Sequence, residues 1–203
     1  MACKIIASAK ECDSRLQQWR AISKYALAPQ PHVSSVVANE FDIPVLHRKP
    51  YGAMHVRRTD KVAVLNTLIT LPNGTRVIRQ SVPEAKSYTA CAYADKLRIV
   101  SGNMRDIDVF LATDDINAVS AELRACTIVN DSQWRIHSFG YSPARSFDRQ
   151  NVYRLWAEIQ LMSKATWVVG TFSSNIDRLV QMIRDQPAAS MISLDRPWRG
   201  PMM

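Results

Sequence analysis

The chain has 203 residues, of which 47% are hydrophobic and 22% are charged, a composition that fits one globular domain and excludes a disordered protein. Its net charge of +8 favours phosphorylated or polyanionic ligands, but Lys and Arg are spread along the chain without the basic, aromatic-interleaved stripe of nucleic-acid binders. No apolar run is long enough to cross a membrane, and the four cysteines form no CxxC pair of the kind that binds zinc.

The first third of the chain predicts two helices, a strand and a hairpin. Apolar residues recur at three-and-four spacing over 11–27, and a short second helix is expected at 32–41. The apolar segment "YGAMHV" (51–56) has the length of a strand and no helical period. Two β-branched runs flank the turn sequence "PNG" within 63–82, which predicts a β-hairpin.

Helices and strands alternate over the rest of the chain. The expected elements are a helix from Pro83 to Val100, a strand at 108–115, a helix at 116–126, a strand at 134–139, a helix at 149–165, a strand at 166–172, a helix at 173–185 and a strand at 190–194. The 149–165 helix is expected to bury Val152, Leu155, Trp156, Ile159 and Met162. This alternation predicts an α/β fold with a Rossmann-like, open and mainly parallel sheet covered by helices on both faces.

The cysteines are Cys3, Cys12, Cys91 and Cys126. Two disulfides and free buried thiols are both compatible with this sequence, and the pairing cannot be assigned from it.

Three polar clusters follow predicted strands: "RRTDK" (57–61), "TDD" (113–115) and "TFSS" (171–174). In open α/β sheets ligands bind at the carboxyl ends of the strands, so we expect the clusters to meet at one site. Guanidinium groups grip phosphates in bidentate fashion, and serines ahead of a helix offer N–H groups to an anion. Taken singly, each cluster also fits a solvated turn or a helix cap. Neither GxGxxG nor GxxxxGK[ST] occurs.

The same segments carry a family resemblance. "HVRRTDKV" (55–62), "LATDD" (111–115) and "TFSSNIDR" (171–178) closely resemble, in order, three motifs of the α-1,6-fucosyltransferases, glycosyltransferase family 23. "SKYALAPQP" (23–31) and "SLD" (193–195) resemble segments before the first motif and after the third. The resemblance implies a helical lead-in over 1–50 and, over 51–203, the Rossmann-like GDP-fucose-binding lobe with a hairpin-like insertion at 63–82.

The resemblance also implies an activity. Enzymes of this family transfer fucose from GDP-fucose to O6 of the innermost N-acetylglucosamine of an N-glycan, with inversion and without a metal. The chain is therefore expected to need no cofactor, to bind GDP-fucose and an N-glycan or glycoprotein acceptor, to bind no nucleic acid, and to work in the Golgi lumen.

Roles for individual residues follow from the matching motif positions. By the resemblance, His55 and Glu158 contact guanine, although the family has Asp at the second of these positions. Arg57 grips the β-phosphate and Lys61 assists the departing diphosphate. The remaining site residues are Arg58, Ser173 and Ser174 beside the phosphates, and Asp60, Asp114 and Asp115, which shape the donor and acceptor site.

One position departs from the family. Leu65 stands where the family has a glutamate thought to act as the general base, and no Glu occurs between Lys61 and Glu84. General acid–base assistance contributes about 10²–10⁴-fold to a rate, and a chain without this glutamate lacks that contribution. The alternative to a transferase is therefore a catalytically silent GDP-sugar-binding lobe. A basic nucleic-acid-binding protein is a more remote alternative, and it predicts binding that falls steeply with salt and ignores guanine.

Overall fold

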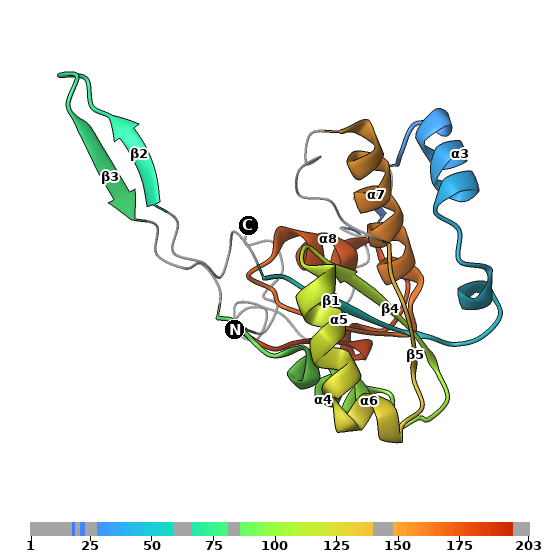
Figure 1. The fold of residues 1–203 in the computed structure, drawn as a ribbon. Helices are drawn as coiled ribbons and strands as arrows, with labels where there is room; N and C mark the ends of the chain where they lie inside the picture. Colours follow the sequence, from blue (N-terminus) through green and yellow to red (C-terminus); the bar gives the residue numbers. More distant parts are fainter. Residues whose placement is uncertain are drawn as a thin grey trace, which may run out of the picture.

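The computed structural model describes residues 18, 21–22, 28–58, 66–80, 86–139 and 148–196. These residues form a five-stranded sheet and a separate two-stranded hairpin (Figure 1). All pairings within the larger sheet are parallel, and the strand order is β5–β4–β1–β6–β7. Its strands are β1 (Gly52–Val56), β4 (Asp108–Thr113), β5 (Arg135–His137), β6 (Trp167–Gly170) and β7 (Met191–Ser193). The predicted α/β class is confirmed.

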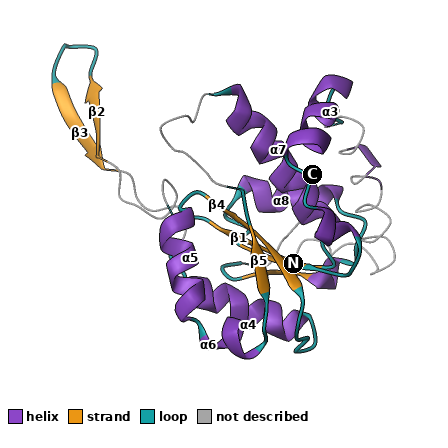
Figure 2. Cartoon of the chain, turned by 45° about the vertical axis from the view of Figure 1, so that its right-hand side comes forward, coloured by secondary structure: helices purple, strands orange, loops and turns teal. Residues whose placement is uncertain are grey.

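Helices cover both faces of this sheet (Figure 2). Helices α4, α5 and α6 pack on one face, and α7 and α8 pack on the other. The helices are α3 (Pro31–Glu40), α4 (Ala90–Val100), α5 (Ile116–Ala125), α6 (Thr127–Asp131), α7 (Arg149–Lys164) and α8 (Asn175–Ile183), with short 3-10 turns at Pro44–His47 and Ala188–Ser190. Most of the helix predicted at 11–27 lies outside the described residues.

Strand β1 lies at the centre of the sheet and is buried along its whole length. Because side chains alternate between the two faces of a strand, Met54 and Val56 enter the core under α4 and α5, whereas Ala53 enters the core under α7. His55 has the same parity as Ala53, so it faces the α7–α8 side. This alternation decides which helices can contact His55.

Helix α4 begins later than predicted. The sequence predicts a start at Pro83, but residues 86–89 are not helical and the helix begins at Ala90. Thr89 is the N-cap, and its hydroxyl accepts a hydrogen bond from the Ala92 N–H at 3.3 Å. The cap therefore fixes the boundary, because it satisfies an N–H group that has no partner within the helix.

The buried face of α7 is also different from the predicted one. Ile159 and Met162 are buried as expected, but Val152 is 58% exposed and Leu155 is 38% exposed. Arg154 and Glu158 are each only 6% exposed. The helix is thus turned so that two charged residues face inward, an arrangement that a search for apolar periodicity cannot find.

The predicted hairpin is present as β2 (Asn66–Thr70) and β3 (Arg76–Gln80), which pair antiparallel. Gly74 has φ +79°, a left-handed conformation that favours glycine in the connecting turn. The hairpin extends away from the parallel sheet (Figure 1), and its paired residues Leu68 and Ile78 are 60% and 69% exposed.

A disulfide joins Cys91 in α4 to Cys126 at the end of α5, with 5.5 Å between the two Cα atoms. It settles one pairing that the sequence left open, while Cys3 and Cys12 lie outside the described residues. No helix among the described residues combines the length and the apolar character needed to cross a membrane.

Candidate functional site

The described residues of the three predicted polar clusters lie at one edge of the sheet. After β1 the chain passes through α4 to β4 and β5 on one side, and it later returns to place β6 and β7 on the other side of β1. The point between β1 and β6 is therefore the topological switch point, where open α/β sheets bind their ligands. Val56 pairs with Thr113 and Met54 with Val169, so the segments that follow these strands emerge side by side.

The segment after β6 is a turn held by its backbone N–H groups. Asp195 accepts hydrogen bonds from the Phe172 N–H at 2.9 Å and the Ser173 N–H at 3.0 Å, and the Ser193 hydroxyl donates to it at 2.6 Å. Burial acts to raise the pKa of Asp195, but the hydrogen bonds from Ser173 and Ser193 outweigh it and the pKa is lowered. The "SLD" segment thus fixes the shape of the "TFSS" segment.

Ser174 is the N-cap of α8. It is 1% exposed, and its hydroxyl accepts a hydrogen bond from the Ile176 N–H at 3.2 Å. Ser173 and Ser174 consequently stand at the positive end of a helix that points its N-terminus toward the end of β6. The predicted position of both serines is confirmed, and their contact with a phosphate remains a prediction.

His55 is buried against a carboxylate of α8. Its Nδ1 lies 2.9 Å from Oδ1 of Asp177, which is fully buried, and the other Asp177 oxygen accepts the Thr171 N–H at 2.9 Å. Gly170 makes this approach possible, because a Cβ atom at that position would overlap the Asp177 carboxylate. Burial alone lowers the pKa of His55, but Asp177 and Glu158 outweigh it, so the pKa is raised.

Glu158 enters the same region from α7. Its Oε1 lies 3.3 Å from Nε of Arg154, and both side chains are almost fully buried. Burial raises the pKa of Glu158 to about 7, although the charges of Arg154 and His55 act in the opposite direction. His55 and Glu158, predicted to act together, therefore influence each other electrostatically across the interface between β1 and α7.

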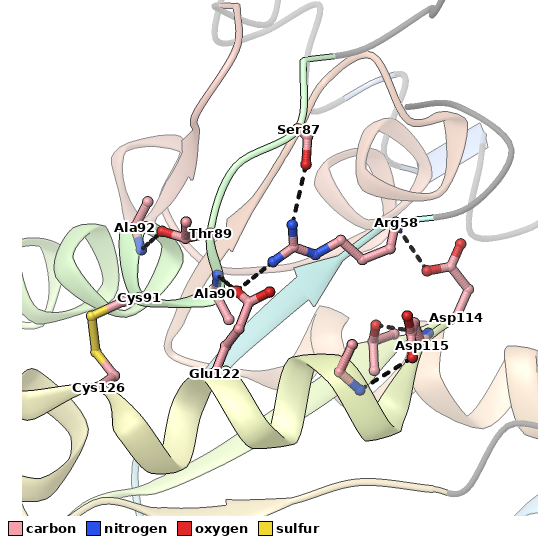
Figure 3. A network of polar contacts seen from close by, with 12 residues as sticks. Arg58, Ser87, Thr89, Ala90, Cys91, Ala92, Asp114, Asp115, Glu122 and Cys126 are labelled. Carbon is pink, nitrogen blue, oxygen red and sulfur yellow. Dashed lines mark hydrogen bonds and ion pairs between the residues drawn. A yellow bond between two sulfur atoms is a disulfide. The ribbon is translucent and has the colours of Figure 1, made fainter. Parts of the chain in front are cut away.

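The two arginines after β1 are partly buried. The Arg58 backbone N–H donates to Asp114 Oδ1 at 2.8 Å, which ties the end of β1 to the end of β4. Its guanidinium group donates to the Ser87 hydroxyl at 3.1 Å and to Glu122 Oε2 at 2.5 Å (Figure 3). Arg57 directly precedes this anchored residue.

Asp115 caps α5 and accepts the Ala118 N–H at 3.2 Å, which is the cap role that the sequence left open for it. Asp60 and Lys61 lie outside the described residues, as do Leu65 and Glu84. Within the described part of the chain, no three His, Cys, Asp or Glu side chains come together to form a metal-binding group.

Three further carboxylates contribute to this site although the sequence alone did not predict a role for them. Asp177 and Asp195 occur inside the quoted segments "TFSSNIDR" and "SLD", and their position one turn into a helix or just after a strand was the available signal. Glu122 had no such signal, because it lies on the polar side of an ordinary amphipathic helix. Its importance depends on the α4–α5 packing, which the sequence does not specify.

Together, the fold and this site define an open α/β protein with a polar, cation-bearing site at its switch point. No protein-family model and no curated protein matches the chain. Among solved structures it is similar to POFUT1 in complex with GDP-fucose, with TM-score 0.42 and 14% identity over 77% of the chain, and to apo POFUT1, with TM-score 0.42 and 15% identity over 77%. The chain spans 44% of the length of either structure.

Proposed function

We propose that the chain is the donor-binding part of a glycosyltransferase that uses GDP-fucose. The observation that carries the proposal is the meeting of three segments at the switch point, because these are the segments that resemble fucosyltransferase motifs. Arg57 and Arg58 follow β1, and Ser173 and Ser174 follow β6 beside it. Cations and helix N-terminal N–H groups at one edge suit a diphosphate.

The buried pair of His55 and Glu158 supports a guanine-binding role. A carboxylate accepts hydrogen bonds and a protonated imidazole donates them, so the pair offers both partners that the edge of guanine needs. Asp177 supports this role by placing a carboxylate oxygen 2.9 Å from Nδ1 of His55, where its charge favours the protonated imidazole. A base that forms hydrogen bonds with these buried groups binds more tightly, whereas a base that leaves them unpaired binds more weakly.

The proposed reaction is fucosyl transfer in α-1,6 linkage to the core N-acetylglucosamine of an N-glycan in the Golgi lumen, without a metal. GDP leaves as fucose is transferred, and fixed cations stabilise the charge that develops on the diphosphate. We propose that Arg57 and Lys61 supply these charges, with Asp60 and Asp114 at the acceptor side.

Leu65 favours a second candidate, a GDP-sugar-binding lobe that does not turn over. The two candidates differ only in that the second has no general base to deprotonate the acceptor hydroxyl. A transfer and hydrolysis assay with GDP-fucose separates the two candidates, since the silent lobe binds the donor without releasing GDP.

Thermal unfolding in the presence of GDP, with ADP as control, tests donor binding. At 100 times Kd, GDP should stabilise the folded state by about 2.7 kcal/mol, which corresponds to a midpoint shift of roughly 5–10 °C for a chain of this size. Arg57→Ala should abolish the shift with little change in the midpoint without ligand. Equal midpoint shifts with GDP and ADP would contradict the proposal. Binding that falls steeply with salt concentration and ignores guanine would also contradict it.

A further inference from the structure

Glu122 lies where three segments meet beside the candidate site (Figure 3). A single oxygen, Oε2, accepts the Arg58 Nη2–H at 2.5 Å and the Ala90 N–H at 2.6 Å. The carboxylate therefore links the segment after β1 to the N-terminus of α4 while it is itself carried by α5. Such hydrogen bonds to a charged acceptor are among the stronger ones in proteins.

The two helices that Glu122 joins are also joined covalently. Cys91 directly follows Ala90 in α4, and Cys126 lies one turn after Glu122 at the end of α5. The disulfide and the Ala90–Glu122 hydrogen bond thus hold the same pair of helices at neighbouring points. As a result, the position of the Glu122 carboxylate is fixed from the α4 side as well as from its own helix.

This fixed carboxylate decides the direction of the Arg58 side chain. The Arg58 backbone N–H is held by Asp114, and its guanidinium group is held by Ser87 and Glu122. Among the described residues, no acceptor forms a hydrogen bond with the buried Nε of Arg58. The guanidinium group is therefore held in one orientation by acceptors at both of its Nη atoms.

We propose that Glu122 is a positioning residue that presets Arg58 to grip the diphosphate of the donor, an inference that rests on the proposed function. A flexible arginine loses side-chain freedom when it binds an anion, and an anchored one has lost it already. The negative charge of Glu122 acts against an approaching phosphate, but its side chain is 37% exposed, so solvent weakens this repulsion.

The test is a competition assay that measures the affinities of GDP and guanosine for the folded chain. Glu122→Gln keeps an oxygen that can accept the Ala90 N–H but removes the charge that holds Arg58. We expect GDP affinity to fall about tenfold, equivalent to about 1.4 kcal/mol, while guanosine affinity and the unfolding midpoint stay unchanged. In an Arg58→Ala background, the same substitution should cause no further loss.

Asp95→Asn is the matched control. Asp95 lies on α4 and pairs with Arg98 of the same helix at 2.9 Å, so the variant breaks an ion pair on the helix that Glu122 contacts without touching Arg58. It should leave both affinities unchanged.

The outcomes separate this inference from the proposed function. If the wild-type chain binds no GDP, both are overturned. If it binds GDP but Glu122→Gln binds equally well or more tightly, the positioning role is overturned and the proposed function stands. A loss shared by guanosine, or one that persists without Arg58, would equally overturn it, because Glu122 would then support the fold and not the arginine.

Discussion

The buried carboxylate of Glu158 predicts an unusual dependence of stability on pH. Burial raises its pKa from the ordinary 4.5 to about 7 in the folded chain. Below pH 4.5 the group is protonated in both states. Between 4.5 and 7 the unfolded chain has released a proton that the folded chain retains, so the folded state loses stability as the pH rises. Above 7 both states are ionised and the loss is complete.

The size of this loss follows from the shift. One pKa unit corresponds to about 1.4 kcal/mol, so the ionisation of Glu158 should cost the folded state about 3 kcal/mol between pH 4.5 and pH 8. The raised pKa of His55 acts in the same direction, since stabilisation of its charged form is lost as the pH rises. The effect of Glu158 must therefore be isolated as a difference between two proteins.

Glu158→Gln provides that difference, because the amide has the same shape and does not ionise. Urea unfolding of both proteins from pH 4.5 to pH 8 should show the variant gaining about 3 kcal/mol relative to the wild type. Glu40→Gln, which changes an exposed carboxylate on α3, is the control and should run parallel to the wild type. Parallel profiles for Glu158→Gln and the wild type would refute the reasoning.

Two further substitutions test the packing around the site. Gly170→Ala should cost about 1–3 kcal/mol in urea unfolding, because its Cβ would overlap the Asp177 carboxylate, whereas a Cβ at Gly52 meets the Leu97 side chain at 2.9 Å, a smaller overlap that should cost less; equal costs would contradict the close approach at Gly170. Replacing both cysteines of the α4–α5 disulfide by alanine opens a loop with a sequence separation of 35 residues, and loop-closure entropy predicts a loss of about 4 kcal/mol; a loss below about 1 kcal/mol would mean that the helix packing alone holds α4 and α5 together.

The sequence predicted most of the elements and the edge of the sheet where polar segments meet. Strands such as β4 and β6 are short, largely apolar and followed directly by a helix, so parallel pairing and its polar edge follow together. The hairpin was predictable for a local reason, since its turn sequence alone fixes the reversal of the chain.

The partners within the site were less predictable. Periodicity treats a charged residue as exposed, so it could not show that Arg154 and Glu158 are buried or that Val152 and Leu155 face solvent. Asp177 lies beside His55 only because Gly170 leaves room for it, a contact that depends on how α8 packs against β1. The disulfide pairing depends on the distance between α4 and α5, which no local pattern specifies.

The sheet places its central strand between partners that are remote in sequence. Gly52 of β1 pairs with Val109 and with Trp167, so the site is complete only after two long stretches of chain have closed. Such closure slows folding, because entropy is lost before the distant contact is made. The disulfide bypasses a separation of 35 residues on the path from β1 to β6. A chain whose disulfide has already formed should therefore refold faster than the reduced chain, because β6 pairs with β1 sooner. The disulfide then promotes folding as well as stabilising the folded state.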